Sequence, residues 1–151
     1  KELGNNMESK IVAEAARATL DGSIPFPEVV RTLLEAGVEY YHVDYVALQN
    51  TYYSTSGEII KTPINDEGLP SVASEFNAEA LRAAILDSQQ NGQHYRDFTK
   101  RAMSAGVQGY IAFLCGKRVT YWGRSGDQHT EWFPGAKPQK TQDIPQQLEL
   151  F

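Results

Sequence analysis

Two pairs of side chains have types and spacing that could support metal binding or acid–base catalysis. His42 and Asp44 are two residues apart, as are His129 and Glu131, so on a strand each pair lies on one face. Imidazole and carboxylate groups ligate divalent metals and exchange protons. Convergence of all four would make the chain a small metal-binding protein or enzyme. The alternative is an ordinary solvated outer sheet face. We favour the latter and predict no catalytic residue, no metal site and no cofactor.

The single cysteine, Cys115, precedes Gly116 in a predicted tight turn. A nucleophilic cysteine needs a pKa lowered by a nearby base or a helix N-terminus, and the sequence supplies neither. We therefore expect a passive thiol. One cysteine also excludes an internal disulfide and a zinc-finger framework, which is typical of a reducing compartment.

The last five residues resemble the pentapeptide by which bacterial polymerases and repair proteins dock on the DNA sliding clamp. That motif consists of glutamine, leucine, a small or acidic residue, leucine and phenylalanine. Leucine and phenylalanine side chains fill an apolar pocket as anchors, and the glutamine amide binds at its entrance. Two alternatives are a tail that folds back on Ile111 and Phe113, and an artificial addition. The predicted partner-binding residues are Gln147, Leu148, Leu150 and Phe151.

Length and charge limit the classes of protein to which the chain can belong. It has 151 residues, enough for one ordinary domain, and a formal net charge of −5. An acidic domain is a poor electrostatic match for nucleic acid or an anionic membrane. No apolar run approaches the ~20 residues of a membrane span, and no signal peptide is recognisable. We expect a cytoplasmic protein that binds neither nucleic acid directly nor membranes.

The elements that must position these residues occur twice in the sequence. Sliding the chain against itself by 69 residues places 26–60 on 95–129 without a gap, with glycines coinciding at predicted caps and turns. This self-similarity predicts an internal duplication of an α-α-β-β-β unit. The identical pairs include Ala36-Gly37-Val38 with Ala105-Gly106-Val107, Thr51-Tyr52 with Thr120-Tyr121, and Ser56-Gly57 with Ser125-Gly126.

Apolar spacing of three and four predicts helices over about 8–20 and 77–90, each followed by a second helix. The second helices have expected buried stripes of Val30, Leu33 and Leu34 in the first half and of Phe98, Ala102 and Met103 in the second. Period-2 alternation then predicts strands whose inward faces include Tyr41 and Tyr110. Turns are expected near 48–50 and 116–117, and third strands at 58–61 and 128–133. The fold class is α+β, an antiparallel sheet with helices packed on one face.

We divide the chain into 1–6, 7–134 and 135–151. The first segment precedes Met7 and is expected to be an artificial addition or disordered. The second is a single domain with halves at about 7–62 and 77–134, joined by a connector over 61–76. The third is a Pro-, Gln- and Lys-rich tail without helical or strand period, which predicts flexibility.

Three segments together resemble a known family. They are the AGVxxY step at 36–41, Thr51-Tyr52-Tyr53 followed by Ser56-Gly57-Glu58, and VTYWGRSGD over 119–127. The chain is similar over about 9–134 to the bacterial and prophage family called domain of unknown function 1398, whose members often carry the label "phage envelope protein". The motifs are structural and carry over no catalytic residue. The resemblance implies a prophage-type accessory protein.

The two predicted halves differ on the outward face of the sheet. The first half presents Tyr40, His42 and Asp44, whereas the second presents the apolar Ile111 and Phe113. An apolar outward stripe needs a cover, either a partner, a second copy or the chain's own tail. A central strand covered on both sides is the alternative. We predict a non-enzymatic adaptor, with a homodimer or partner contact at Ile111 and Phe113 and clamp docking through the tail.

Overall fold

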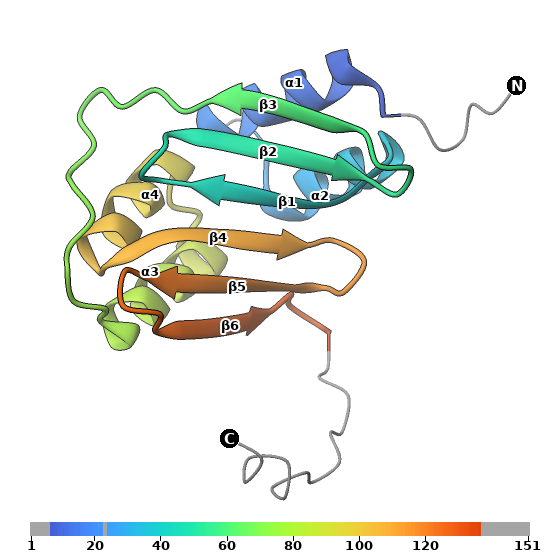
Figure 1. Ribbon diagram of the computed structural model, residues 1–151. Helices are drawn as coiled ribbons and strands as arrows, with labels where there is room; N and C mark the ends of the chain where they lie inside the picture. Colours follow the sequence, from blue (N-terminus) through green and yellow to red (C-terminus); the bar gives the residue numbers. More distant parts are fainter. Residues whose placement is uncertain (1–6, 23, 137–151) are drawn as a thin grey trace, which may run out of the picture.

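The computed structural model describes residues 7–22 and 24–136, which form two units with the same elements in the same order (Figure 1). The first unit contains α1 (Ser9–Leu20), α2 (Phe26–Glu35), β1 (Val38–Asp44), β2 (Gln49–Ser54) and β3 (Ile59–Pro63). The second contains α3 (Ala78–Asn91), α4 (Tyr95–Ser104), β4 (Val107–Phe113), β5 (Arg118–Gly123) and β6 (Gln128–Trp132). The predicted α+β class is confirmed.

All six strands form one antiparallel sheet in the order β3-β2-β1-β4-β5-β6. The four helices lie behind this sheet in Figure 1, and the other face is turned toward the viewer. The central pairing of β1 with β4 joins the units and places His42 opposite Ile111, residues that are 69 apart in the chain. Corresponding strands are therefore arranged about an approximate two-fold axis at this pair.

Local sequence explains where the helices begin and end. The Asn77 side chain accepts a hydrogen bond from the Ala80 amide at 3.0 Å, the cap predicted for α3. Pro27 occupies the first turn of α2, where its missing amide costs nothing. Gly37 and Gly106 follow α2 and α4 with φ of +94° and +91°, a left-handed conformation that favours glycine. At Gly106, a side chain would also collide with the Glu75 carbonyl oxygen.

The core lies between the helices and the inner face of the sheet. Phe98, Ala102 and Met103 are buried as predicted, but the buried stripe of α2 is Val29 and Leu33. Leu34 is 40% exposed, so its predicted burial was wrong. Residues 29, 33 and 36 share the helix face that meets the sheet, and Leu34 lies about 100° away from it.

Two strand boundaries also differ from the prediction. The first hairpin turn lies before β2, which already begins at Gln49, and β3 continues to Pro63. Leu48 and Lys117 occupy corresponding places in the two turns and have left-handed φ of +58° and +60°. Leu48 is not a typical left-handed residue, so the sequence did not mark it as the end of the first turn. The second turn was predicted at 116–117, and β5 begins at Arg118. No helix among the described residues is long and apolar enough to cross a membrane.

Candidate functional site

The four residues proposed for metal or acid–base chemistry lie on opposite faces of the sheet. His42 is opposite Ile111 and Thr51 on the face away from the helices. His129 is opposite the buried Tyr121, so it lies on the helix-facing side near the sheet edge. Paired residues of neighbouring antiparallel strands share a face. The predicted outer placement of His129 and Glu131 was therefore wrong, and the four side chains do not converge.

In each pair, at least one side chain is hydrogen bonded to a group close by in the sequence. The Asp44 carboxylate accepts hydrogen bonds from the Val46 and Ala47 amides at 3.0 and 2.9 Å, which fixes the turn after β1. His129 Nε2 lies 3.0 Å from Glu131 Oε1. No group of three or more His, Cys, Asp or Glu side chains that could hold a metal occurs among residues 7–22 and 24–136.

Cys115 lies in the turn between β4 and β5, as predicted, and the structure shows that it is exposed. The clamp-motif residues Gln147, Leu148, Leu150 and Phe151 lie outside the described residues. Ile111 and Phe113 are partly buried side chains on the outward face of β4.

The sheet surface turned away from the helices, here called the open face, is rich in aromatic side chains. Its central members are Tyr40, His42, Ile111, Phe113, Thr120 and Trp122. One cross-strand row runs through Tyr53, Tyr40 and Phe113, with ring centroids 4.7 and 6.2 Å apart. The same row continues to Arg118, whose guanidinium carbon lies 4.7 Å from the centroid of the Trp132 ring. Ring stacking and the cation–π contact fix these side chains relative to one another.

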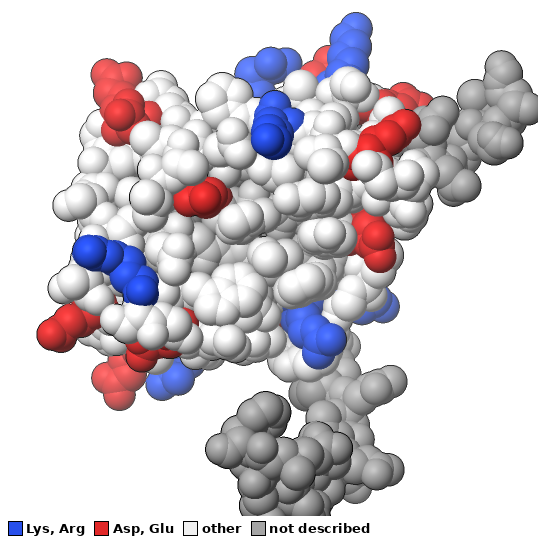
Figure 2. Space-filling view, in the orientation of Figure 1, with Lys and Arg blue, Asp and Glu red and all other residues white. Residues whose placement is uncertain are grey.

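Charged groups are scarce at the middle of the open face. Figure 2 shows this side of the molecule white over the central strands, with Lys, Arg, Asp and Glu mostly toward its rim. Three charged residues of the strands lie on this face. Lys61 is on the edge strand β3, Arg118 packs in the aromatic row, and Asp44 is at the end of β1, where it binds the following turn. An aromatic centre with a charged rim has the composition of a protein–protein contact surface.

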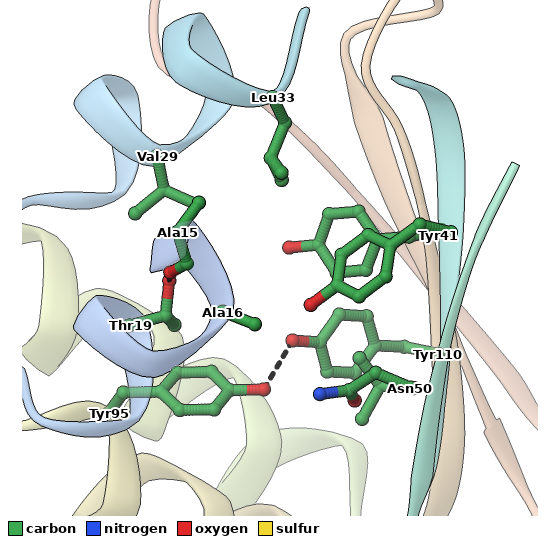
Figure 3. A pocket seen from close by; sticks show the side chains of 11 residues that line it. Ala15, Ala16, Thr19, Val29, Leu33, Tyr41, Asn50, Tyr95 and Tyr110 are labelled. Atoms are coloured by element: carbon green, nitrogen blue, oxygen red, sulfur yellow. Dashed lines mark hydrogen bonds between the residues drawn. The ribbon is translucent and has the colours of Figure 1, made fainter. Parts of the chain in front are cut away.

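A second polar feature lies inside the fold, between α1 and the sheet. A cavity of about 20 Å³, space for one water molecule, is lined by small side chains of α1 and by phenol groups of the strands. In Figure 3, Tyr41 and Tyr110 point from the sheet toward Ala16 and Thr19. The hydroxyls of Tyr95 and Tyr110 are hydrogen bonded at 2.5 Å.

A smaller cavity of about 10 Å³ adjoins Tyr95 and is lined by Tyr45 and Thr99, whose buried hydroxyls have no hydrogen-bond partner within normal distance among the described residues. Burial raises the pKa of Tyr45 and Tyr110 well above the usual value, and the Tyr95 pKa is raised by the same cause. These phenols are therefore neutral at physiological pH and offer hydrogen bonds rather than charge.

Sequence reasoning found Ile111 and Phe113 but missed three other members of the open face: Arg118, Trp122 and Trp132. Their signal was present as period-2 alternation with Thr120 and Thr130. Applying the same alternation to all six strands would have placed both tryptophans on the outer face. The unpaired Tyr45 hydroxyl has no such signal, because it depends on the packing of α4 against β1.

Comparison with known proteins gives a family but no activity. A family model described as "Protein of unknown function (DUF1398)" matches residues 14–130. An uncharacterised protein of Mycobacterium bovis is 28% identical over 118 residues, which cover 75% of this chain and 69% of the relative. Two uncharacterised proteins of Mycobacterium tuberculosis strains match to the same extent.

Proposed function

The chain belongs to the DUF1398 family, and from this premise we propose that it is a non-enzymatic, prophage-type adaptor. Its open face binds a protein partner, and residues 147–151 dock on a bacterial sliding clamp. The observation that carries the proposal is the open face, since an aromatic, charge-poor sheet surface is costly to leave in water. Tyrosine, tryptophan, phenylalanine and arginine are also the residue types enriched where proteins bind one another.

The composition of the tail supports the clamp contact. In Gln147-Leu148-Glu149-Leu150-Phe151, Glu149 separates the apolar Leu148 from the adjacent apolar pair Leu150 and Phe151. A short segment of this kind buries Leu150 and Phe151 as anchors, and Pro145 before it limits the conformational entropy lost on docking. The last strand, β6, ends at Trp132, so nineteen residues of the sequence follow the sheet.

A direct binding measurement tests the clamp contact. The single exposed cysteine, Cys115, accepts a fluorescent maleimide on the full chain, and purified bacterial clamp is titrated while anisotropy is followed. We expect a Kd between about 1 and 100 μM, which is typical of a short peptide anchor. The double variant Leu150→Ala, Phe151→Ala should bind at least about tenfold more weakly.

The matched control is Glu149→Ala, which changes the variable position between the anchors and should leave the affinity within about twofold. A labelled peptide of residues 142–151 should reproduce the binding of the full chain. No binding at about 100 μM clamp, or equal binding by the double variant, would contradict clamp docking.

A further inference from the structure

We infer that the partner of the open face is a second copy of this chain, packed sheet to sheet. This inference rests on the proposed partner-binding function and identifies its partner. In one copy, residues 7–22 and 24–136 form two layers, the helices and one sheet, and none of these residues covers the outer face of the sheet (Figure 1). Two copies placed face to face bury both open faces in one central layer about 10 Å thick, as in a β-sandwich.

The area of the open face matches what a stable dimer needs. Six strands at ~4.8 Å spacing and five to seven residues at ~3.3 Å rise span roughly 25 by 20 Å. Burying about 500 Å² in projection on each copy removes at least ~1,000 Å² in total, the lower bound for a specific interface. A short peptide would cover only part of this surface, whereas another sheet of the same size covers all of it.

A second copy suits the usual geometry of a homodimer contact. Homodimers most often use an isologous contact, in which one patch meets its own copy. In a face-to-face pair the dimer axis lies in the plane between the two sheets, and a side chain on that axis meets its own copy. This is tolerable for an aliphatic side chain such as Ile111, at the centre of the face, and unfavourable for a charged one.

Charge is compatible with self-association. The chain carries a net charge of −5, so two copies repel each other in general. On the open face, however, Asp44 is held by the Val46 and Ala47 amides, and Arg118 lies over Trp132. The centre of the face therefore brings no free carboxylates together when two copies meet.

The chain contains its own reporters for the test. Its only two tryptophans, Trp122 and Trp132, both lie on the open face. Sedimentation velocity of the full chain between about 1 and 200 μM should show a monomer converting to a dimer. Tryptophan emission should shift to shorter wavelength over the same concentrations, because the indoles leave water.

Charge introduced at the centre of the face should break the dimer. Ile111→Arg and Thr120→Arg change partly exposed residues that are outside the core, so both variants should stay folded by circular dichroism. We expect the dimer dissociation constant of each to rise at least about tenfold. The control Leu86→Arg places the same charge on α3, where Leu86 is 50% exposed, and should dimerise as the parent chain does.

A monomer at about 200 μM would overturn the inference. A monomer whose tryptophan emission shifts to longer wavelength in the variant Leu150→Ala, Phe151→Ala would identify the chain's own tail as the cover, which also overturns it. Dimerisation unaffected by both arginine substitutions would exclude this face. A dimer that does not bind the clamp upholds the inference and contradicts only the proposed tail function.

Discussion

The two α-α-β-β-β units have the same arrangement of helices and strands but differ in the side chains of their cores. Their strands pair in corresponding registers about the central pair of His42 and Ile111. On the helix-facing side, however, Val29 corresponds to Phe98, Ala16 to Ile85 and Asn50 to Val119, each 69 residues along. The first unit uses the smaller or more polar residue each time. The 20 Å³ cavity lies on its side of the core, lined mainly by α1, α2, β1 and β2.

The comparison distinguishes glycines at helix ends and turns, which are the same in both units, from core residues, which differ between them. Gly37 and Gly106 end corresponding helices, and Gly57 and Gly126 turn corresponding hairpins, all with positive φ. Backbone conformations of this kind depend on the residue at a single position. Core volume is instead a property of many contacting side chains, so corresponding core positions can differ in size and polarity without changing the arrangement of the strands.

The largest difference between the units should appear on truncating their corresponding core residues. Phe98 packs between Tyr95 and Tyr121, with centroids 6.1 and 6.4 Å away, and Phe98→Ala should lower the free energy of unfolding by about 3–5 kcal/mol. Val29→Ala removes fewer atoms beside an existing cavity and should cost about 2 kcal/mol. Urea denaturation measures both. Equal losses would mean that the surroundings of Phe98 collapse onto the space left by the ring more completely than those of Val29 do.

A smaller effect should separate two glycines that have the same backbone conformation. Gly106→Ala must adopt φ of +91° and collide with the Glu75 carbonyl, so we expect a loss of about 3 kcal/mol. Gly126→Ala has φ of +95° but no heavy atom within 4 Å of the new methyl, and should cost about 1 kcal/mol. Thermal melts of both variants compare them. Similar losses would show that the Glu75 segment moves aside easily.

Most helices, strands and turns could be predicted from the sequence because the residues that determine them act on their own part of the backbone. Asn77, Pro27 and Gly106 act through their own backbone groups, and the alternation of Tyr41 with His42 follows from strand geometry. Long-range placement could not be predicted. That His129 faces the helices depends on the register of β6 against β5, which one residue of slip would reverse. The exposure of Leu34 likewise depends on how α2 lies on the sheet.

The candidate surface was predictable in part for the same reason. Ile111 stood out because its counterpart at the corresponding position, His42, is polar. Trp132 and Arg118 form a pair across two strands, and only the register of β5 with β6 brings them together. Residues whose role depends on a partner strand need that strand's position before they can be recognised.

Removing two buried tyrosine hydroxyls, one hydrogen bonded and one not, should change the free energy of unfolding by different amounts. Tyr110→Phe removes the partner of Tyr95 and should cost about 1 kcal/mol, since a 2.5 Å hydrogen bond is lost. Tyr45→Phe removes a buried hydroxyl that has no protein partner and should leave stability unchanged or slightly higher. Urea denaturation measures both. A loss of about 1 kcal/mol or more for Tyr45→Phe would show instead that this hydroxyl is hydrogen bonded, either to the neighbouring Thr99 or Tyr95 or to a bound water.

The smallest expected effect concerns an ion pair confined to the second unit. Asp87 on α3 accepts hydrogen bonds from Asn91 and, at 2.7 Å, from Arg101 on α4, and these hold its pKa below the usual value of 3.8. A lowered pKa means that the folded state favours the carboxylate. The contribution is therefore present above the unfolded pKa and is lost as pH falls through the folded one.

The corresponding positions in the first unit are Ala18 and Thr32, which carry no charge, so removing the pair tests a feature of one unit alone. Asp87→Asn should melt slightly below the parent chain at pH 7, and the difference should shrink as the pH falls below 3.8 and through the lowered pKa of Asp87. The pair is exposed, so added salt at pH 7 should also reduce the difference. A difference that persists at low pH would mean that Asp87 acts through its shape and hydrogen bonds rather than its charge.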